Sequence, residues 1–201
     1  ISFPTEYGTV YTLSELEALS QVCHDAQIPL YIDGARLGYG LAAKDGNVTL
    51  KDIARLADVF YIGGTKMGTL MGEAVVVTNP ALLKNMTPLM KQHGALLAKG
   101  RLLGVQFAAL FSNDLYLNIG RYAVELAITL KNEFFARGYD IVVDSPTNQQ
   151  FFRLPNDLID QLKQHASFEL WGPPGKTHSI VRFVTSWSTT YNDINRLIEL
   201  I

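Results

Sequence analysis

The sequence predicts an α/β fold in which a mainly parallel sheet is followed by a small α+β domain. Over the first 112 residues, short apolar runs that end in glycine turns alternate with amphipathic helical segments. Beyond this point the strands are short, and they alternate with helical segments and a Gly-Pro-rich loop. We therefore expect a first domain over residues 1–112 and a smaller one over residues 113–201.

The first two elements are expected to be a helix and a buried strand. Thr12 and Glu15 have the spacing of a capping box, and apolar residues follow at helical intervals until a proline forbids continuation. The apolar run 28–32 then ends at Asp33 and Gly34, as a buried parallel strand ends in a turn.

A second helix and strand complete a βαβ unit. Thr49 and Asp52 can cap a helix that runs through Ala57. The run 58–62 has the composition of a buried strand and is stopped by two glycines. A strand connected through a helix to a second strand favours parallel pairing.

The remaining elements follow from the same signals. We expect a further strand at 73–78 and a mostly helical stretch from 81 to about 111. In the second domain we expect helices at 115–137, 156–164 and 191–201, and strands at 141–143, 149–154 and 179–186. Trp171 and Trp187 are expected to be core residues.

Composition excludes several classes of function. The chain has 201 residues and is 48% hydrophobic, enough for a sizeable core. Its 17 Lys and Arg against 19 Asp and Glu give a net charge of −2, with no basic stretch that would bind nucleic acid. No apolar run is long enough to span a bilayer, so we expect no membrane partner.

Cysteine and histidine usage argues against metal sites and disulfides. Cys23 is the only cysteine, which rules out an intrachain disulfide and favours a reducing cytoplasm. The histidines are scattered without the spacing of metal ligands, so no metal is expected.

Two ionisable residues, Asp33 and Lys66, each lie just past the end of a predicted parallel strand. Open α/β sheets place their ligand crevices at this edge. A lysine in an apolar, glycine-bounded turn is partly desolvated, which favours the neutral amine and makes it a nucleophile toward carbonyls. A nearby carboxylate can keep a cofactor nitrogen protonated. The alternative is that Asp33 caps its turn and Lys66 is a surface lysine.

The two blocks that contain these residues carry a resemblance. Residues Tyr31–Gly38 (YIDGARLG) and, one βαβ unit later, Tyr61–Gly68 (YIGGTKMG) resemble the threonine aldolase group of the beta-eliminating lyase family of pyridoxal-phosphate enzymes. Residues 4–9, 91–104 and 181–187 match more loosely. The resemblance implies the aspartate-aminotransferase-like fold (fold type I), with residues 1–112 forming the C-terminal part of the cofactor-binding large domain.

The resemblance also implies roles for five residues. Lys66 would be the Schiff-base lysine, and Asp33 would pair with the pyridine nitrogen of pyridoxal 5′-phosphate. Thr65 would contact the cofactor phosphate. Arg36 and Arg182 would hold the substrate α-carboxylate, with Arg36 also next to the cofactor. The alternative for both arginines is an ion pair within the protein.

The implied activity is that of a low-specificity threonine aldolase, a carbon–carbon lyase that cleaves β-hydroxy-α-amino acids to glycine and an aldehyde. Three alternatives stay open. A β-eliminating lyase or racemase would use the same residues, and a cofactor-free Schiff-base aldolase would use Lys66 alone. A non-catalytic C-terminal fragment would use none of them. We expect a homodimer or homotetramer whose site is completed by an N-terminal segment that this chain lacks. The stretch Pro4-Thr5-Glu6 lacks the histidine that many family members carry nearby.

Overall fold

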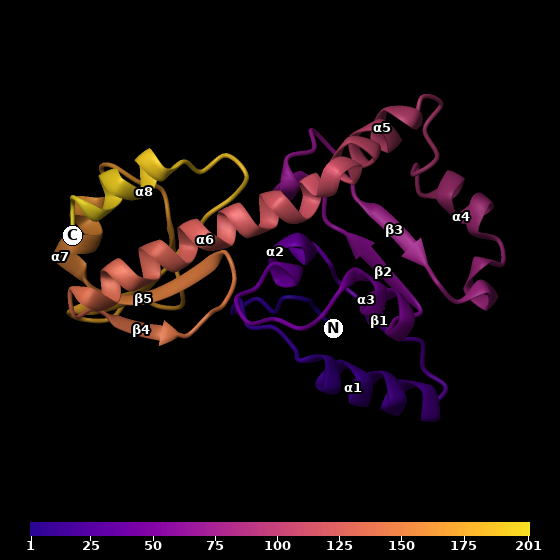
Figure 1. Ribbon diagram of the computed structural model, residues 1–201, viewed down its shortest axis with the longest axis horizontal. Helices are drawn as coiled ribbons and strands as arrows, with labels where there is room; N and C mark the ends of the chain where they lie inside the picture. The colour runs from indigo at the N-terminus through magenta and orange to yellow at the C-terminus, as the bar shows by residue number, and fades with distance from the viewer.

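One long helix, α6 (Leu115–Ala136), crosses the molecule and joins two packed regions (Figure 1). The computed structural model describes residues 1–201. Tyr116 and Ala123, in the first half of α6, belong to the hydrophobic cluster of the first region. Leu130 and Phe134, in the second half, belong to the cluster of the second region. The proposed domain boundary after residue 112 therefore falls just before a helix that serves both cores.

The first region contains a three-stranded sheet with the order β1-β2-β3. Its main elements are α1 (Leu13–Asp25), β1 (Tyr31–Ile32), α2 (Leu37–Leu41), α3 (Leu50–Leu56), β2 (Val59–Ile62), β3 (Ala74–Val77), α4 (Met86–Gln92) and α5 (Arg101–Leu110), with the short 3-10 helices η1 (Thr65–Met67), η2 (Pro80–Leu83) and η3 (Ser112–Asp114). β1 and β2 are parallel, Ser2 forms a parallel bridge with Asp33, and β3 is antiparallel to β2. Two of the three pairings are thus parallel.

Both helix starts that were predicted from capping residues are confirmed. The Thr12 hydroxyl accepts a hydrogen bond from the backbone of Glu15, whose carboxylate accepts one from the Thr12 backbone. Thr49 and Asp52 form the same reciprocal pair at the start of α3. These boxes satisfy backbone N–H groups that have no partner within the helix.

The structure corrects two of the predicted elements and adds one that was not predicted. The strand expected at 28–32 is reduced to Tyr31–Ile32, because the N–H of Ile28 still bonds to Cys23 at the end of α1. The helical stretch expected at 81–111 is divided into η2, α4 and α5, with Gly94 at φ +69° after α4. Helix α2 was not predicted, since its sequence LGYGL contains two poor helix formers.

The second region is a four-stranded antiparallel sheet with the order β4-β5-β7-β6. Its elements are β4 (Asp140–Val143), β5 (Gln149–Pro155), α7 (Asn156–Leu162), β6 (Glu169–Leu170), β7 (His178–Val184) and α8 (Tyr191–Ile198). α6 packs against β4, β5 and α8, and α7 packs against β5 (Figure 1). The small α+β unit expected here is present, and the two-residue β6 is an addition to it.

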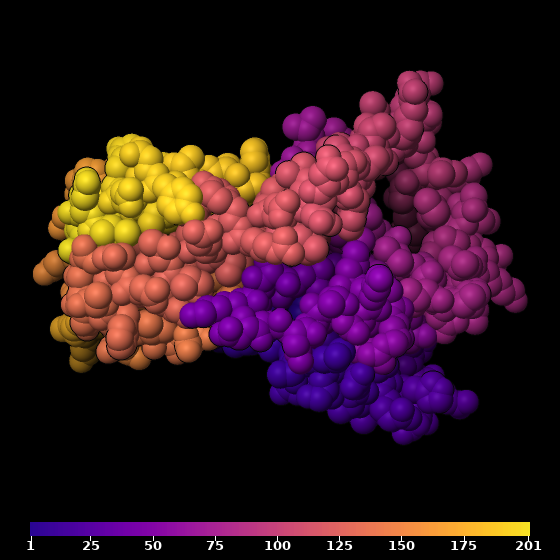
Figure 2. All heavy atoms as spheres, viewed as in Figure 1, coloured from indigo at the N-terminus to yellow at the C-terminus, as the bar shows by residue number.

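The segment of α4 and α5 protrudes from the rest of the molecule (Figure 2). It exposes several large apolar side chains: Leu89, Leu96, Leu97, Leu102 and Val105. No helix combines the length and apolarity needed to cross a membrane.

Candidate active site

The turns that follow β1 and β2 lie against each other at the C-terminal edge of the parallel pair. The N–H of Gly63 donates to the carbonyl of Gly34 at 2.9 Å. A Cβ on Gly34 would lie 1.8 Å from the carbonyl oxygen of Tyr61, so only glycine permits this approach. Asp33 and Lys66 therefore emerge from adjacent turns, as expected for a crevice at this edge.

A buried tyrosine of α6 connects helix α2 with the turn that follows β2. The hydroxyl of Tyr116 accepts a hydrogen bond from Gly38 N at 3.0 Å and donates to the carbonyl of Gly63 at 3.1 Å. Nearby, the hydroxyl of Tyr39 donates to the carbonyl of Lys66. Burial raises the pKa of Tyr39 to about 12, so this hydroxyl stays a donor at neutral pH. The backbone around Lys66 is thus fixed from two sides.

Asp33 has one oxygen engaged and one open. Oδ1 accepts hydrogen bonds from the Tyr61 hydroxyl at 2.6 Å and from Ala35 N at 3.0 Å, while no protein group bonds to Oδ2. Desolvation raises the pKa of Asp33, but Tyr61, Ala35 and the charge of Lys66 together bring it below the ordinary value. Asp33 is therefore an ionised carboxylate with a free acceptor.

The ammonium of Lys66 has no hydrogen-bond or ion-pair partner in the protein. Although the side chain is exposed, desolvation and then the charge of Arg36 lower the pKa of Lys66, against the opposing charges of Glu6, Glu73 and Asp33. A lowered pKa increases the fraction of neutral, nucleophilic amine at a given pH.

A cavity of about 160 Å³ opens beside this lysine. Both regions contribute to its walls, which are formed by Arg36, Tyr39, Lys66, Asn148, Val184, Thr185, Ser186 and Trp187. Trp187 is 52% exposed here rather than buried in a core as expected. The Nδ2 of buried Asn148 donates to the carbonyl of Thr185, which leaves its Oδ1 without a partner.

Thr65 is engaged with a protein carboxylate. Its hydroxyl donates to Glu73 Oε1 at 2.8 Å, and Gly64 N donates to Oε2 of the same side chain. A contact between Thr65 and a phosphate stays a prediction, and it requires the hydrogen bond to Glu73 to break.

Arg182, on β7, has protein partners at both terminal nitrogens of its guanidinium, whereas its buried Nε has none. It donates to Gln149 Oε1 at 3.0 Å, forms an ion pair with Glu169, and stacks on Trp171 at 4.6 Å from the ring centroid. Glu6 Oε2 lies 3.8 Å from Nη1. These contacts show how a cation that is only 7% exposed is stabilised inside the sheet, and they include the ion pair within the protein that was the alternative to substrate binding.

The open groups fit the cofactor that the resemblance implies. Lys66 offers a free amine for an aldehyde, and the open Oδ2 of Asp33 offers an acceptor for a protonated ring nitrogen. Sequence reasoning missed Tyr61, Glu6 and Asn148, because nothing in their local pattern separates them from ordinary polar residues. Only their contacts across the fold do so.

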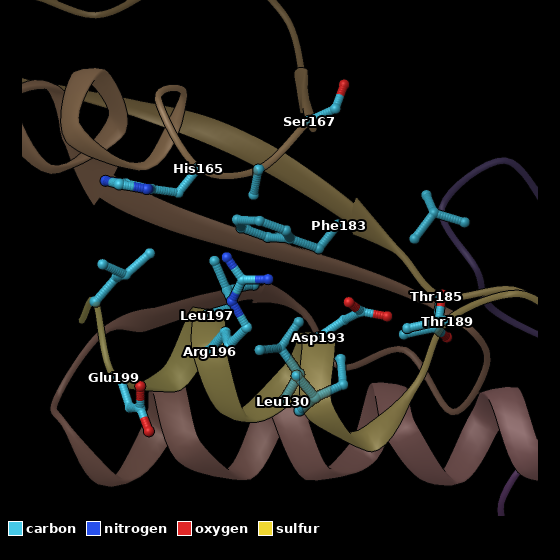
Figure 3. Close-up of a pocket in the computed structure, with 14 residues that line it drawn as sticks. Leu130, His165, Ser167, Phe183, Thr185, Thr189, Asp193, Arg196, Leu197 and Glu199 are labelled. Atoms are coloured by element: carbon cyan, nitrogen blue, oxygen red, sulfur yellow. The ribbon is translucent and has the colours of Figure 1, made fainter.

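A second cavity, of about 370 Å³, lies in the second region between α6, β7 and α8 (Figure 3). Leu130, Phe183 and Leu197 form part of its apolar wall, and His165 and Asp193 are among its polar lining residues. None of the residues predicted to carry chemistry reaches this cavity, so we place the candidate active site beside Lys66.

Comparison with known proteins gives a consistent set of relatives. The sequence model of the family described as "Beta-eliminating lyase" matches residues 3–154. A low specificity L-threonine aldolase from Pseudomonas aeruginosa is 30% identical over 200 residues, covering 98% of this chain and 55% of the relative. One from Saccharomyces cerevisiae is 30% identical over 157 residues, covering 78% of this chain and 40% of the relative. The chain thus spans about half the length of the curated relatives it matches.

Solved structures show the same fold. A threonine aldolase from Leishmania major superposes with a TM-score of 0.96 at 40% identity, covering all of this chain and 58% of that one. An aspartate aminotransferase from Thermus thermophilus gives a TM-score of 0.68 at 16% identity, over 100% of this chain and 55% of that one. The second likeness concerns the fold alone.

Proposed function

Because the chain belongs to the beta-eliminating lyase family, which has the fold of type I pyridoxal-phosphate enzymes and depends on that cofactor, we propose that the whole protein is a low-specificity threonine aldolase. It would cleave β-hydroxy-α-amino acids such as threonine to glycine and an aldehyde. The relatives that support this proposal carry that activity in their names.

The observation that carries the proposal is the pair of open groups at the ends of β1 and β2. Asp33 keeps Oδ2 free while its pKa is held below the ordinary value, and Lys66 keeps its amine free while its pKa is lowered. When bound, the cofactor's protonated pyridine ring accepts the negative charge that develops at the substrate Cα. An ionised Asp33 favours that protonated ring.

The neutral amine of Lys66 would bind the cofactor aldehyde and be released when the substrate amine takes its place. Arg36 and Arg182 would then hold the substrate carboxylate from the two regions of the molecule. A carboxylate held at two points fixes the rotation about Cα, and this rotation decides which Cα bond is broken. With the Cα–Cβ bond aligned, cleavage would release an aldehyde as the β-hydroxyl gives its proton to water, and a proton returned to Cα would complete glycine.

The proposal is tested on the full-length protein loaded with pyridoxal phosphate. We expect acetaldehyde and glycine in equal amounts from both L-threonine and L-allo-threonine. Lys66→Ala should abolish this product and the visible absorption band, whereas Lys84→Ala, which alters an exposed lysine of the same region, should keep both. Pyruvate from L-serine without aldehyde from threonine would instead identify a β-eliminating lyase and contradict the proposal.

We further propose a cytoplasmic homodimer or homotetramer. The exposed apolar side chains of α4 and α5 support an assembly that covers them, and a single cysteine suits a reducing compartment. Light scattering of the full-length protein measures the assembly, and a monomer at micromolar concentration would contradict it.

A further inference from the structure

The turn formed by residues 5–9 is built into the boundary between the two regions. Thr5 N bonds to Thr9 O and Gly8 N bonds to Thr5 O, both at 2.9 Å. The carbonyl of Gly8 accepts hydrogen bonds from the hydroxyls of Ser145 at 3.0 Å and Thr147 at 3.1 Å, two fully buried residues of the second region. Gly8 has φ +71°, and a Cβ there would lie 2.4 Å from Ser145 Oγ. The position of this turn is therefore fixed on both sides.

This turn presents Glu6 to two arginines that come from different regions. Glu6 Oε1 lies 3.8 Å from Nη1 of Arg36, and Oε2 lies 3.8 Å from Nη1 of Arg182. The two arginine side chains are 16% and 8% exposed, whereas that of Glu6 is 66% exposed. One carboxylate thus gives one oxygen to each of two shielded guanidinium groups, and its other side faces water.

This arrangement matches the task that the proposed function gives to the arginines. There, the same two groups hold the α-carboxylate of an amino acid, again between the two regions. In the free protein, Glu6 and Glu169 already balance the charges of Arg36 and Arg182. A further carboxylate placed beside Glu6 would meet a like charge at short range, which is unfavourable in a partly shielded site.

We propose that Glu6 is a specificity-determining residue whose carboxylate occupies the α-carboxylate subsite in the free protein and is exchanged for the substrate carboxylate on binding. The inference rests on the proposed function for the ligand of the two arginines. Glu6 can leave at little cost, because its side chain is largely solvated and such ion pairs are weak. A ligand that lacks a carboxylate cannot replace the Glu6 carboxylate beside the two arginines. The site therefore discriminates amino acids from simple amines.

If Glu6 had only a structural role, its removal would change the affinity for a carboxylate ligand in the opposite direction. If Glu6 only holds the arginines in position for the substrate, its removal should loosen them and weaken carboxylate binding. The exchange model predicts tighter binding, since a competitor is removed. The two roles are therefore separated by the direction of one change in affinity.

The experiment titrates glycine into the full-length protein loaded with pyridoxal phosphate and follows the visible absorption spectrum. For Glu6→Gln we expect a glycine Kd about two- to tenfold below that of the wild type, in keeping with the loss of partly exposed ion pairs. The Kd of methylamine, which has no carboxylate, should not change. Glu17→Gln is the matched control, because Glu17 is a partly exposed glutamate of α1 paired with Arg55 of α3, and neither residue lines the cavity beside Lys66. It should leave both values unchanged.

A second readout needs no cofactor. Phenylglyoxal modifies accessible arginines, and peptide mass spectrometry reports Arg36 and Arg182 separately. We expect faster modification of both in Glu6→Gln, and stronger protection by glycine than in the wild type. An unchanged or higher glycine Kd in Glu6→Gln, or an equal tightening of methylamine, would overturn the inference. Neither readout involves bond cleavage. Tighter glycine binding without aldehyde formation would therefore contradict the proposed aldolase activity and leave the inference about Glu6 standing.

Discussion

The charged groups that follow β1 and β2 differ from the arginine within β7 in how many protein partners they have. At the first place, Asp33 keeps one oxygen open and Lys66 has no partner. At the second, Arg182 is surrounded by Gln149, Glu169 and an aromatic ring. The difference indicates that the groups proposed to bind the cofactor are open, whereas the arginine proposed to bind the substrate carboxylate is already paired with the protein's own carboxylates. Cofactor binding at Asp33 and Lys66 would then need little rearrangement, whereas substrate binding at Arg182 would need an exchange of carboxylates.

Of the substitutions at these two places, Asp33→Asn is expected to have the largest effect on activity. A neutral amide no longer favours the protonated ring nitrogen, so turnover should fall by about a hundredfold or more while the cofactor stays bound. Steady-state kinetics and the absorption spectrum of one preparation measure both quantities. Asp157→Asn, an exposed change on α7, is the control and should leave both intact. Turnover within about tenfold of the wild type would make Asp33 a structural turn residue.

A smaller effect is expected from Arg182→Lys. A single ammonium replaces the bidentate fork poorly, so the KM for threonine should rise about tenfold with little change in cofactor affinity. Glu169→Gln removes the ion-pair partner while leaving the guanidinium in place. It should lower the melting temperature without raising KM. Lost stability with an unchanged KM in Arg182→Lys would show that this arginine serves only the fold.

The smallest effect is expected from Tyr61→Phe and depends on pH. The Tyr61 hydroxyl helps to hold the pKa of Asp33 below its ordinary value, so its loss raises that pKa. Asp33 then takes up its proton at a higher pH, and the acidic limb of the kcat/KM profile should move upward while activity near neutral pH changes only slightly. The stability contribution of an ionised Asp33, which is lost as pH falls through its folded pKa, should shrink for the same reason. An acidic limb that does not move would contradict this role of Tyr61.

The features predicted from sequence are those with local signals. The capping boxes at Thr12 and Thr49 need only residues within one turn of helix. Asp33 and Lys66 could be singled out because each follows an apolar run and lies in a turn that contains glycine. The fold then brings the ends of the adjacent strands together. Their chemical roles remain proposals.

The features that were missed depend on contacts across the fold. α2 contains two glycines and is stabilised by burial against the rest of the first region, which no propensity reveals. Glu6 becomes notable only because Arg36 and Arg182, far apart in sequence, converge on it. Trp187 was expected in a core, since tryptophan is usually buried, yet it lines the cavity beside Lys66.

The central claim is that Lys66 is the residue that binds the cofactor. Reduction of the loaded full-length protein with borohydride, followed by digestion and mass spectrometry, fixes the cofactor to its lysine and identifies it. We expect the added mass on the peptide that contains Lys66 and on no other, because this lysine alone combines a free amine, a lowered pKa and a position beside the open carboxylate of Asp33. Label on Lys44, Lys84 or Lys91 instead would contradict the account.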